Sequence, residues 1–277
     1  MSELPLNIQR LIGKYEPIET EGLTLYPIKV ESYYEFLVAK QALDFMQQSL
    51  PVKLMSIPLL EAYFKLDTGQ VEGREPSGLF MSAILALSLA LRLKPTGTIE
   101  EQIKQFQIIQ DPKDPTRLKH LRCVKSGEEI ITITPVQFQK LRPIIAAQNG
   151  IELYSDMANP ELVQAEQDLA NAKAPNLDMS IEALVSAAAL IAKVEEKEIY
   201  EWPILKMNRR LESAKRIIDY IICGIGESQG TSWKGGNPFP HPWFERKTES
   251  NGGLMALDKF ANGQGLKAIQ DAEISNP

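Results

Sequence analysis

Hydrophobic positions recur along this chain mainly at the spacing of helices. The stretch 30–46 has one apolar face at a period near 3.6 residues, which predicts an amphipathic helix. That face consists of Tyr33, Phe36, Leu37, Leu43 and Met46. A helix is also predicted over 59–66, and Pro76 is expected to open the apolar helix that follows it. This apolar run, 79–91, is shorter than the roughly 18 to 20 residues of a membrane span, so it predicts a buried core helix.

The second half of the chain has the same helical texture. Helix starts are predicted at 159–161 and at 180–183. A long helix is predicted from about 203 to 227, and we expect its single apolar stripe to pack against the earlier helices. The stripe consists of Ile204, Leu205, Leu211, Ala214, Ile217, Ile218, Ile221 and Ile222.

Strand patterns are confined to two places. Residues 23–28 predict one short strand, and Pro27 suits only its end or a sheet edge. Between 98 and 150, β-branched and aromatic residues predict three strands, at 105–109, 118–124 and 128–132, with a tight turn at 125–127. Helix caps enclose them, with Thr98 and Glu101 before the strands and Thr134, Pro135 and Gln137 after them.

The pattern therefore predicts a mainly α fold: a multi-helix body with a small inserted antiparallel β-meander and a flexible C-terminal arm. We divide the chain into a helical region with one short strand (1–97), a small α+β insertion (98–150) and a second helical region (151–228). A Gly/Pro/aromatic arm with a short tail helix follows (229–277).

Composition narrows the class of protein. The 277 residues are 44% hydrophobic, enough to fill a core. The two cysteines, Cys123 and Cys223, and the lack of a signal peptide favour reduced thiols, no disulfide and a cytoplasmic location. A net charge of -6 disfavours nucleic-acid binding. No membrane partner is expected.

The most suggestive catalytic motif is Gly226-x-Ser228-x-Gly230, which matches the nucleophile elbow of serine hydrolases. An elbow needs a strand before the serine, whereas a long helix is predicted here. Of the partners that should follow, only His241 is present, and 231–240 contains no carboxylate. We interpret Gly224, Gly226 and Gly230 as residues that end the helix, and we expect no catalytic residue and no enzyme.

No cofactor or metal site is expected either. His120 and Cys123 are three positions apart on a predicted strand, so they point to opposite faces and cannot share one ion. The glycine pairs near 252 and 263 lack the lysine and the preceding strand of a phosphate-binding loop.

The C-terminal arm carries the candidate partner-binding residues. Aromatic side chains alternate with prolines whose restricted backbone reduces the entropy lost on docking. Two interpretations stay open: the arm forms an interface, or it packs back over the chain's own helices. The candidates are Trp233, Phe239, Trp243 and Phe244 in the arm and Leu254, Met255, Leu257 and Phe260 in the tail helix.

Three stretches resemble the tail assembly chaperones of phages that infect Gram-positive bacteria. They are 21–36 (EGLTLYPIKVESYYEF), 134–151 (TPVQFQKLRPIIAAQNGI) with 159–162 (NPEL), and 238–244 (PFPHPWF). The resemblance implies a non-enzymatic chaperone that binds and solubilises the tape measure protein and helps recruit tail tube subunits in the host cytoplasm. The alternative is a structural tail or baseplate component that stays in the virion.

Overall fold

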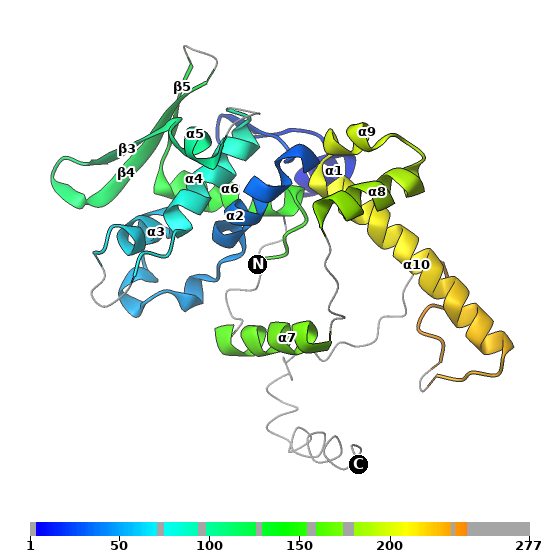
Figure 1. Cartoon of the computed structure of the whole chain (residues 1–277). Helices are drawn as coiled ribbons and strands as arrows, with labels where there is room; N and C mark the ends of the chain where they lie inside the picture. The colour runs from blue at the N-terminus through cyan, green and yellow to red at the C-terminus, as the bar shows by residue number, and fades with distance from the viewer. Residues whose placement is uncertain are drawn as a thin grey trace, which may run out of the picture. The chain divides into compact units, whose positions relative to one another are not determined.

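The computed structural model describes residues 4–70, 75–93, 98–125, 129–153, 159–173, 180–233 and 236–242. Helices dominate, and a three-stranded antiparallel sheet is inserted among them (Figure 1), so the predicted mainly α class with a β-meander is confirmed. Two compact units are present: 1–157 with 178–214, and 158–177 with 215–277. The first unit includes the α-helices α1 to α6, α8 and α9, and the second includes α7; α10 begins in the first and ends in the second.

The first unit is built around α4 (Leu79–Leu91), in which every residue except Met81 is buried. This helix packs against α2 (Tyr33–Asp44) and α3 (Leu59–Asp67). Its burial confirms the core helix that the apolar run predicted. The other helices of the unit are α1 (Leu6–Lys14), α5 (Ile99–Ile103), α6 (Pro135–Gln148), α8 (Ile181–Ala192) and α9 (Glu196–Tyr200), with short 3-10 turns at Val30–Ser32, Gln47–Ser49 and Val52–Leu54.

Polar contacts fix the ends of these helices. Asp67, at the end of α3, accepts hydrogen bonds from the backbone N–H groups of Gly78 (2.9 Å) and Phe80 (2.8 Å), and so caps the start of α4. The start of α4 at Leu79 lies three residues after the predicted opening at Pro76. The Tyr63 hydroxyl donates to the Ala42 carbonyl at 2.9 Å, where α2 is about to end.

The predicted single strand at 23–28 is shorter and has a partner. β2 (Leu23–Leu25) pairs antiparallel with β1 (Ile18–Thr20), which the sequence did not indicate. The two are joined by Glu21 and Gly22, both with positive φ, the conformation of a tight hairpin turn. Three-residue strands are too short to show an alternating pattern, which is why β1 was missed.

The meander consists of β3 (Phe106–Asp111), β4 (Asp114–Lys125) and β5 (Glu129–Ile133), with β4 in the middle. The caps around it form as expected. The Thr98 side chain accepts a hydrogen bond from the Glu101 N–H, and Thr134 and Gln137 complete a capping box at the start of α6.

The remaining helices are α7 (Pro160–Lys173) and the 25-residue α10 (Ile204–Ser228). The start of α10 is held by two backbone hydrogen bonds: Ile204 N–H donates to Ile28 at 2.9 Å, and Val30 N–H donates to Trp202 at 2.8 Å. Within the described parts of the chain, no helix combines the length and apolar character needed to cross a membrane.

Candidate protein-binding surface

One face of α10 is apolar along the whole helix, but only its first half is covered. Ile204 and Met207 are fully buried, and Leu211 packs partly against the core. Further along the same face lie four isoleucines, which we call the isoleucine stripe. The exposed fractions are 55% for Ile218, 50% for Ile221, 60% for Ile222 and 53% for Ile225.

The sequence predicted that the apolar stripe of the whole long helix packs against the earlier helices. This prediction is wrong for the second half of α10. The apolar spacing of three and four residues was found correctly, but spacing does not show what covers a face. Ile225 was missed, although it continues the spacing of Ile218 and Ile221. Contiguous exposed apolar side chains of this kind are typical of a protein-binding surface.

The borders of the stripe differ in character. On one side lie Lys215 and Asp219, both charged, and on the other Ile217 and Gly224, both uncharged. Tyr220 lies on the opposite face, because residues two apart on a helix do not share a side. The stripe is thus a narrow apolar band with a charged border and an uncharged one, a shape that suits an apolar partner helix.

The arm begins beside this stripe. Gly226 is one helical turn beyond Ile222, and a Cβ on Gly226 would lie 3.1 Å from the Trp233 ring. The Thr231 N–H donates to the Gly226 carbonyl at 2.9 Å, at the turn that brings Trp233 back against α10. Trp233 and Phe239 are both half-buried. The other six candidates, Trp243, Phe244, Leu254, Met255, Leu257 and Phe260, lie outside the described residues.

The Gly226-x-Ser228-x-Gly230 motif lies at the end of α10, where no strand precedes the serine. The Ser228 hydroxyl donates to the Ile225 carbonyl at 2.7 Å. Gly224 and Gly226 lie inside the helix, so their assignment as helix-ending residues was wrong; Gly230, with a φ of 86°, does lie just past the end. A hydrolase elbow requires a strand–turn–helix, which this segment does not form.

His120 and Cys123 lie on β4, opposite Ile109 and Phe106 of β3. Burial and the neighbouring charges of Lys119 and Arg122 lower the pKa of His120. Cys123 and Cys223 are both buried and unbridged. Within the described residues, no cluster of three or more His, Cys, Asp or Glu side chains could hold a metal ion.

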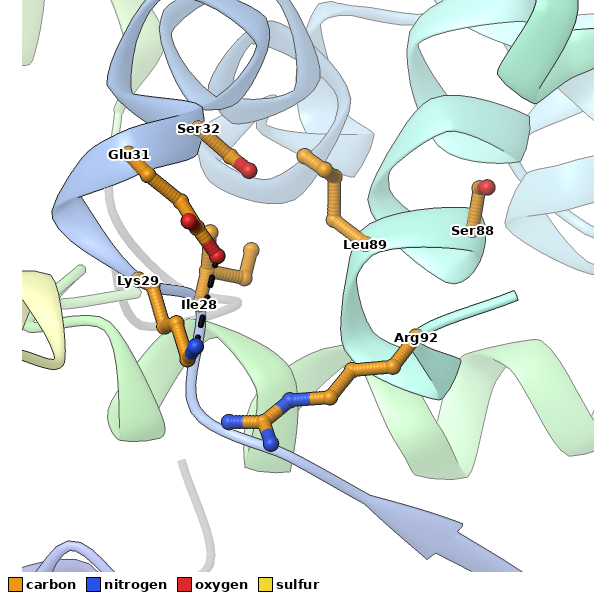
Figure 2. Close-up of a pocket in the computed structure, with 7 residues that line it drawn as sticks. All are labelled: Ile28, Lys29, Glu31, Ser32, Ser88, Leu89 and Arg92. Carbon is orange, nitrogen blue, oxygen red and sulfur yellow. Dashed lines mark ion pairs between the residues drawn. The ribbon is translucent and has the colours of Figure 1, made fainter. Parts of the chain in front are cut away.

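A pocket of about 160 Å³ lies between the end of α4 and the segment before α2 (Figure 2). Lys29 forms ion pairs with Glu31, at 3.4 Å, and with Glu201. The Arg92 guanidinium lies 4.6 Å from the centre of the Tyr26 ring. The pocket is lined by Ile28, Lys29, Glu31, Ser32, Ser88, Leu89 and Arg92. The lysine and the arginine thus both have partners within the protein, and the lysine holds the segment before α2 against the residue after α9.

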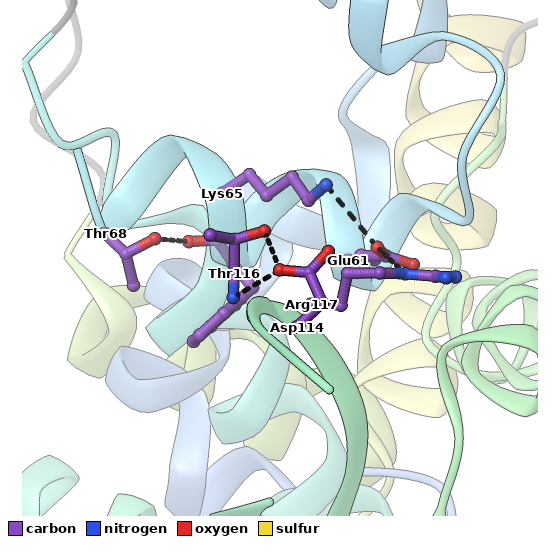
Figure 3. Close-up of polar contacts among 7 residues, drawn as sticks. Glu61, Lys65, Thr68, Asp114, Thr116 and Arg117 are labelled. Atoms are coloured by element: carbon purple, nitrogen blue, oxygen red, sulfur yellow. Dashed lines mark hydrogen bonds and ion pairs between the residues drawn. The ribbon is translucent and has the colours of Figure 1, made fainter. Parts of the chain in front are cut away.

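A second polar cluster joins α3 to the meander (Figure 3). The Glu61 side chain, only 4% exposed, pairs with Arg117 of β4 at 3.3 Å and with Lys65 at 3.7 Å. Asp114 accepts two hydrogen bonds from Thr116, which lower its pKa and shape the turn between β3 and β4. This cluster fixes the meander on the helices and is explained by folding alone.

Comparison with protein-family models, with curated proteins and with solved structures finds no match to this chain. The isoleucine stripe and the start of the arm are the features of the described residues that bear on function.

Proposed function

We propose that this chain is a phage tail assembly chaperone that binds and solubilises the tape measure protein, helps recruit tail tube subunits and has no enzymatic activity. It acts in the host cytoplasm during assembly. The exposed isoleucine stripe of α10 is the observation that carries the proposal, because an apolar band on a helix is suited to an amphipathic client helix.

The energetics of the stripe suit a chaperone. Burying the exposed half of an isoleucine contributes roughly 1 kcal/mol, so the four together contribute about 4 kcal/mol, and a client's apolar face adds a similar amount. Association costs about 4 to 15 kcal/mol in lost freedom. The total gain of about 8 kcal/mol lies within the range of this cost, so the complex is weak and reversible, which lets the chaperone leave as the tube polymerises.

The arm supports the second part of the proposal, the recruitment of tail tube subunits. Trp233 and Phe239 are half-buried aromatic side chains on a Gly/Pro-rich segment that starts at the end of α10. Aromatic anchors of this kind are frequent at interfaces. A tube subunit that binds the arm would bind next to the client, which places the two components of the tail on one chaperone.

Co-expression tests the function. The chain is produced together with the longest helical protein encoded beside it, with and without residues 229–277, and the soluble fraction of that client is measured. We expect the full chain to keep the client soluble. If the client stays insoluble and the chain is found in purified particles, the protein is a structural tail or baseplate component and the proposal is wrong.

A further inference from the structure

One face of the meander is exposed and basic. Six Lys or Arg residues and two Asp residues give the segment 104–125 a net charge of +4, in a chain whose net charge is -6. The other face is buried, with Leu121 and Cys123 in the core, and β4 contacts α3 and α6. On the exposed face of β4 lie Lys119, His120 and Arg122, which we call the basic row.

A β-bulge brings the basic row together. Leu118 and Leu121 are both buried, although residues three apart on a regular strand face opposite sides. Both reach the core because the pairing of β4 with β3 skips Lys119, which becomes the extra residue of the bulge. The two residues between the leucines, Lys119 and His120, therefore lie together on the exposed side.

Arg122 extends the row on the same face. It is two residues beyond His120, which corresponds to about 7 Å along a strand. Its cross-strand neighbours are Gln107 on β3 and Thr132 on β5, both exposed and uncharged. The residues paired with Arg122 on either side thus provide no carboxylate for its guanidinium.

The two cations of the row have no counter-ion in the described part of the chain. Neither Lys119 nor Arg122 forms an ion pair there, whereas Arg117 on the same strand pairs with Glu61. Burial lowers the pKa of His120, and the charges of Lys119 and Arg122 lower it further, so both cations act on the same imidazole. An anionic partner would offset this gathering of like charges.

We propose that the basic row binds an acidic, extended peptide segment of a partner protein. Alternate side chains of an extended segment point to one side about 7 Å apart, which is also the spacing of His120 and Arg122. One carboxylate then pairs with the Arg122 guanidinium through two parallel hydrogen bonds. The carboxylate two residues away reaches Lys119 and His120. This surface belongs to the first unit and does not depend on the proposed function.

Nucleic acid fits the row less well than a peptide does. A duplex has roughly one negative charge per 1.7 Å of its axis, and its binding sites use many cations along that length. The row offers two cations within about 10 Å of strand. The remainder of the chain is strongly acidic and repels a long polyanion, whereas a peptide with a few carboxylates can bind at the row alone.

Fluorescence anisotropy tests the proposal. The full chain is titrated into a fluorescein-labelled octapeptide of alternating Glu and Thr, and we expect binding that weakens as salt is added. Lys119→Gln with Arg122→Gln should weaken it about tenfold, because two exposed ion pairs are lost. Lys53→Gln with Lys197→Gln removes the same charge from exposed positions elsewhere in the unit and should bind like the wild type. Circular dichroism checks that both variants fold.

Two further probes test the kind of partner. An octapeptide of alternating Gln and Thr should not bind, and a single-stranded DNA octamer should bind more weakly than the acidic peptide. The proposal is overturned if the wild type fails to bind the acidic peptide at about 1 mM chain. It is also overturned if the two double variants weaken binding equally, if the Gln peptide binds as well, or if the DNA binds more tightly.

Discussion

Gly226 of α10 and Trp233 of the arm lie so close that a Cβ on Gly226 would be 3.1 Å from the Cη2 atom of the indole ring. The glycine therefore provides the room in which the ring docks on the helix. The contact places the first aromatic residue of the arm one helical turn from Ile222, at the border of the isoleucine stripe.

Gly226→Ala is expected to displace the Trp233 ring. A methyl group so close to the ring forces it to move, while the helix itself gains about 1 kcal/mol from the better helix former. Acrylamide quenching of Trp233 fluorescence, in a chain with Trp202→Phe and Trp243→Phe, should increase. Gly224→Ala is the matched control: a Cβ there meets nothing within 4 Å, so the quenching should stay unchanged. Equal quenching in both variants would contradict the contact.

The Glu61–Arg117 pair is expected to couple the meander to α3. Glu61 is nearly buried, whereas the Arg117 side chain is 57% exposed, so we expect a coupling energy of about 1 kcal/mol, at the upper end for exposed pairs. Urea unfolding of Glu61→Ala, Arg117→Ala and the double variant measures it.

The exposed Glu100–Lys104 pair, 3.9 Å apart, provides the reference cycle for this measurement. Its coupling should be at most about 0.5 kcal/mol. If the two cycles give the same coupling energy, burial of Glu61 does not strengthen its pair.

Alkaline pH is expected to lower the stability of the protein by breaking the Lys29–Glu201 pair near the start of α10. A hydrogen bond to Glu201, assisted by the charge of Glu31, raises the pKa of Lys29 above its ordinary value of 10.5, and partial burial opposes the shift. The folded protein thus holds this proton more tightly than the unfolded chain does. The stability that the pair contributes is fully present below pH 10.5 and is lost as the pH rises through the folded-state pKa.

Comparison of the wild type with Glu201→Gln isolates this contribution from the other groups that titrate at high pH. Urea midpoints are measured at about pH 9 and about pH 11.5, on either side of the ordinary pKa of lysine. The wild type should lose more stability between the two than Glu201→Gln does. Equal losses would show that the ion pair is not the source.

The elements that the sequence predicted well are those whose signals are local. The apolar run of α4 and the Thr134 capping box each lie within one continuous stretch of sequence, and both form as expected. The cap on α4 was not predictable, because Asp67 reaches it from another helix. The β1 strand, three residues long, offers no period to detect.

The sequence predicted the apolar face of α10 but not which part of that face is exposed. Periodicity identifies an apolar face, and Ile204 and Ile218 belong to the same face of α10. Whether a face is covered depends on tertiary packing, which buries Ile204 and leaves Ile218 exposed. The arm was recognised by its composition, but its docking at Gly226 depends on a close contact that the sequence does not show.

The most direct test of the central claim is the solubility of the co-expressed client when the stripe is made polar. Ile218→Glu with Ile225→Glu changes two side chains that are more than half exposed, and should alter stability by about 1 kcal/mol at most, about 0.5 kcal/mol for each substitution. The account predicts that this chain stays folded and loses the client to the insoluble fraction, while Tyr220→Glu keeps it soluble. A client held in solution equally well by all three chains would contradict the claim that the isoleucine stripe binds it.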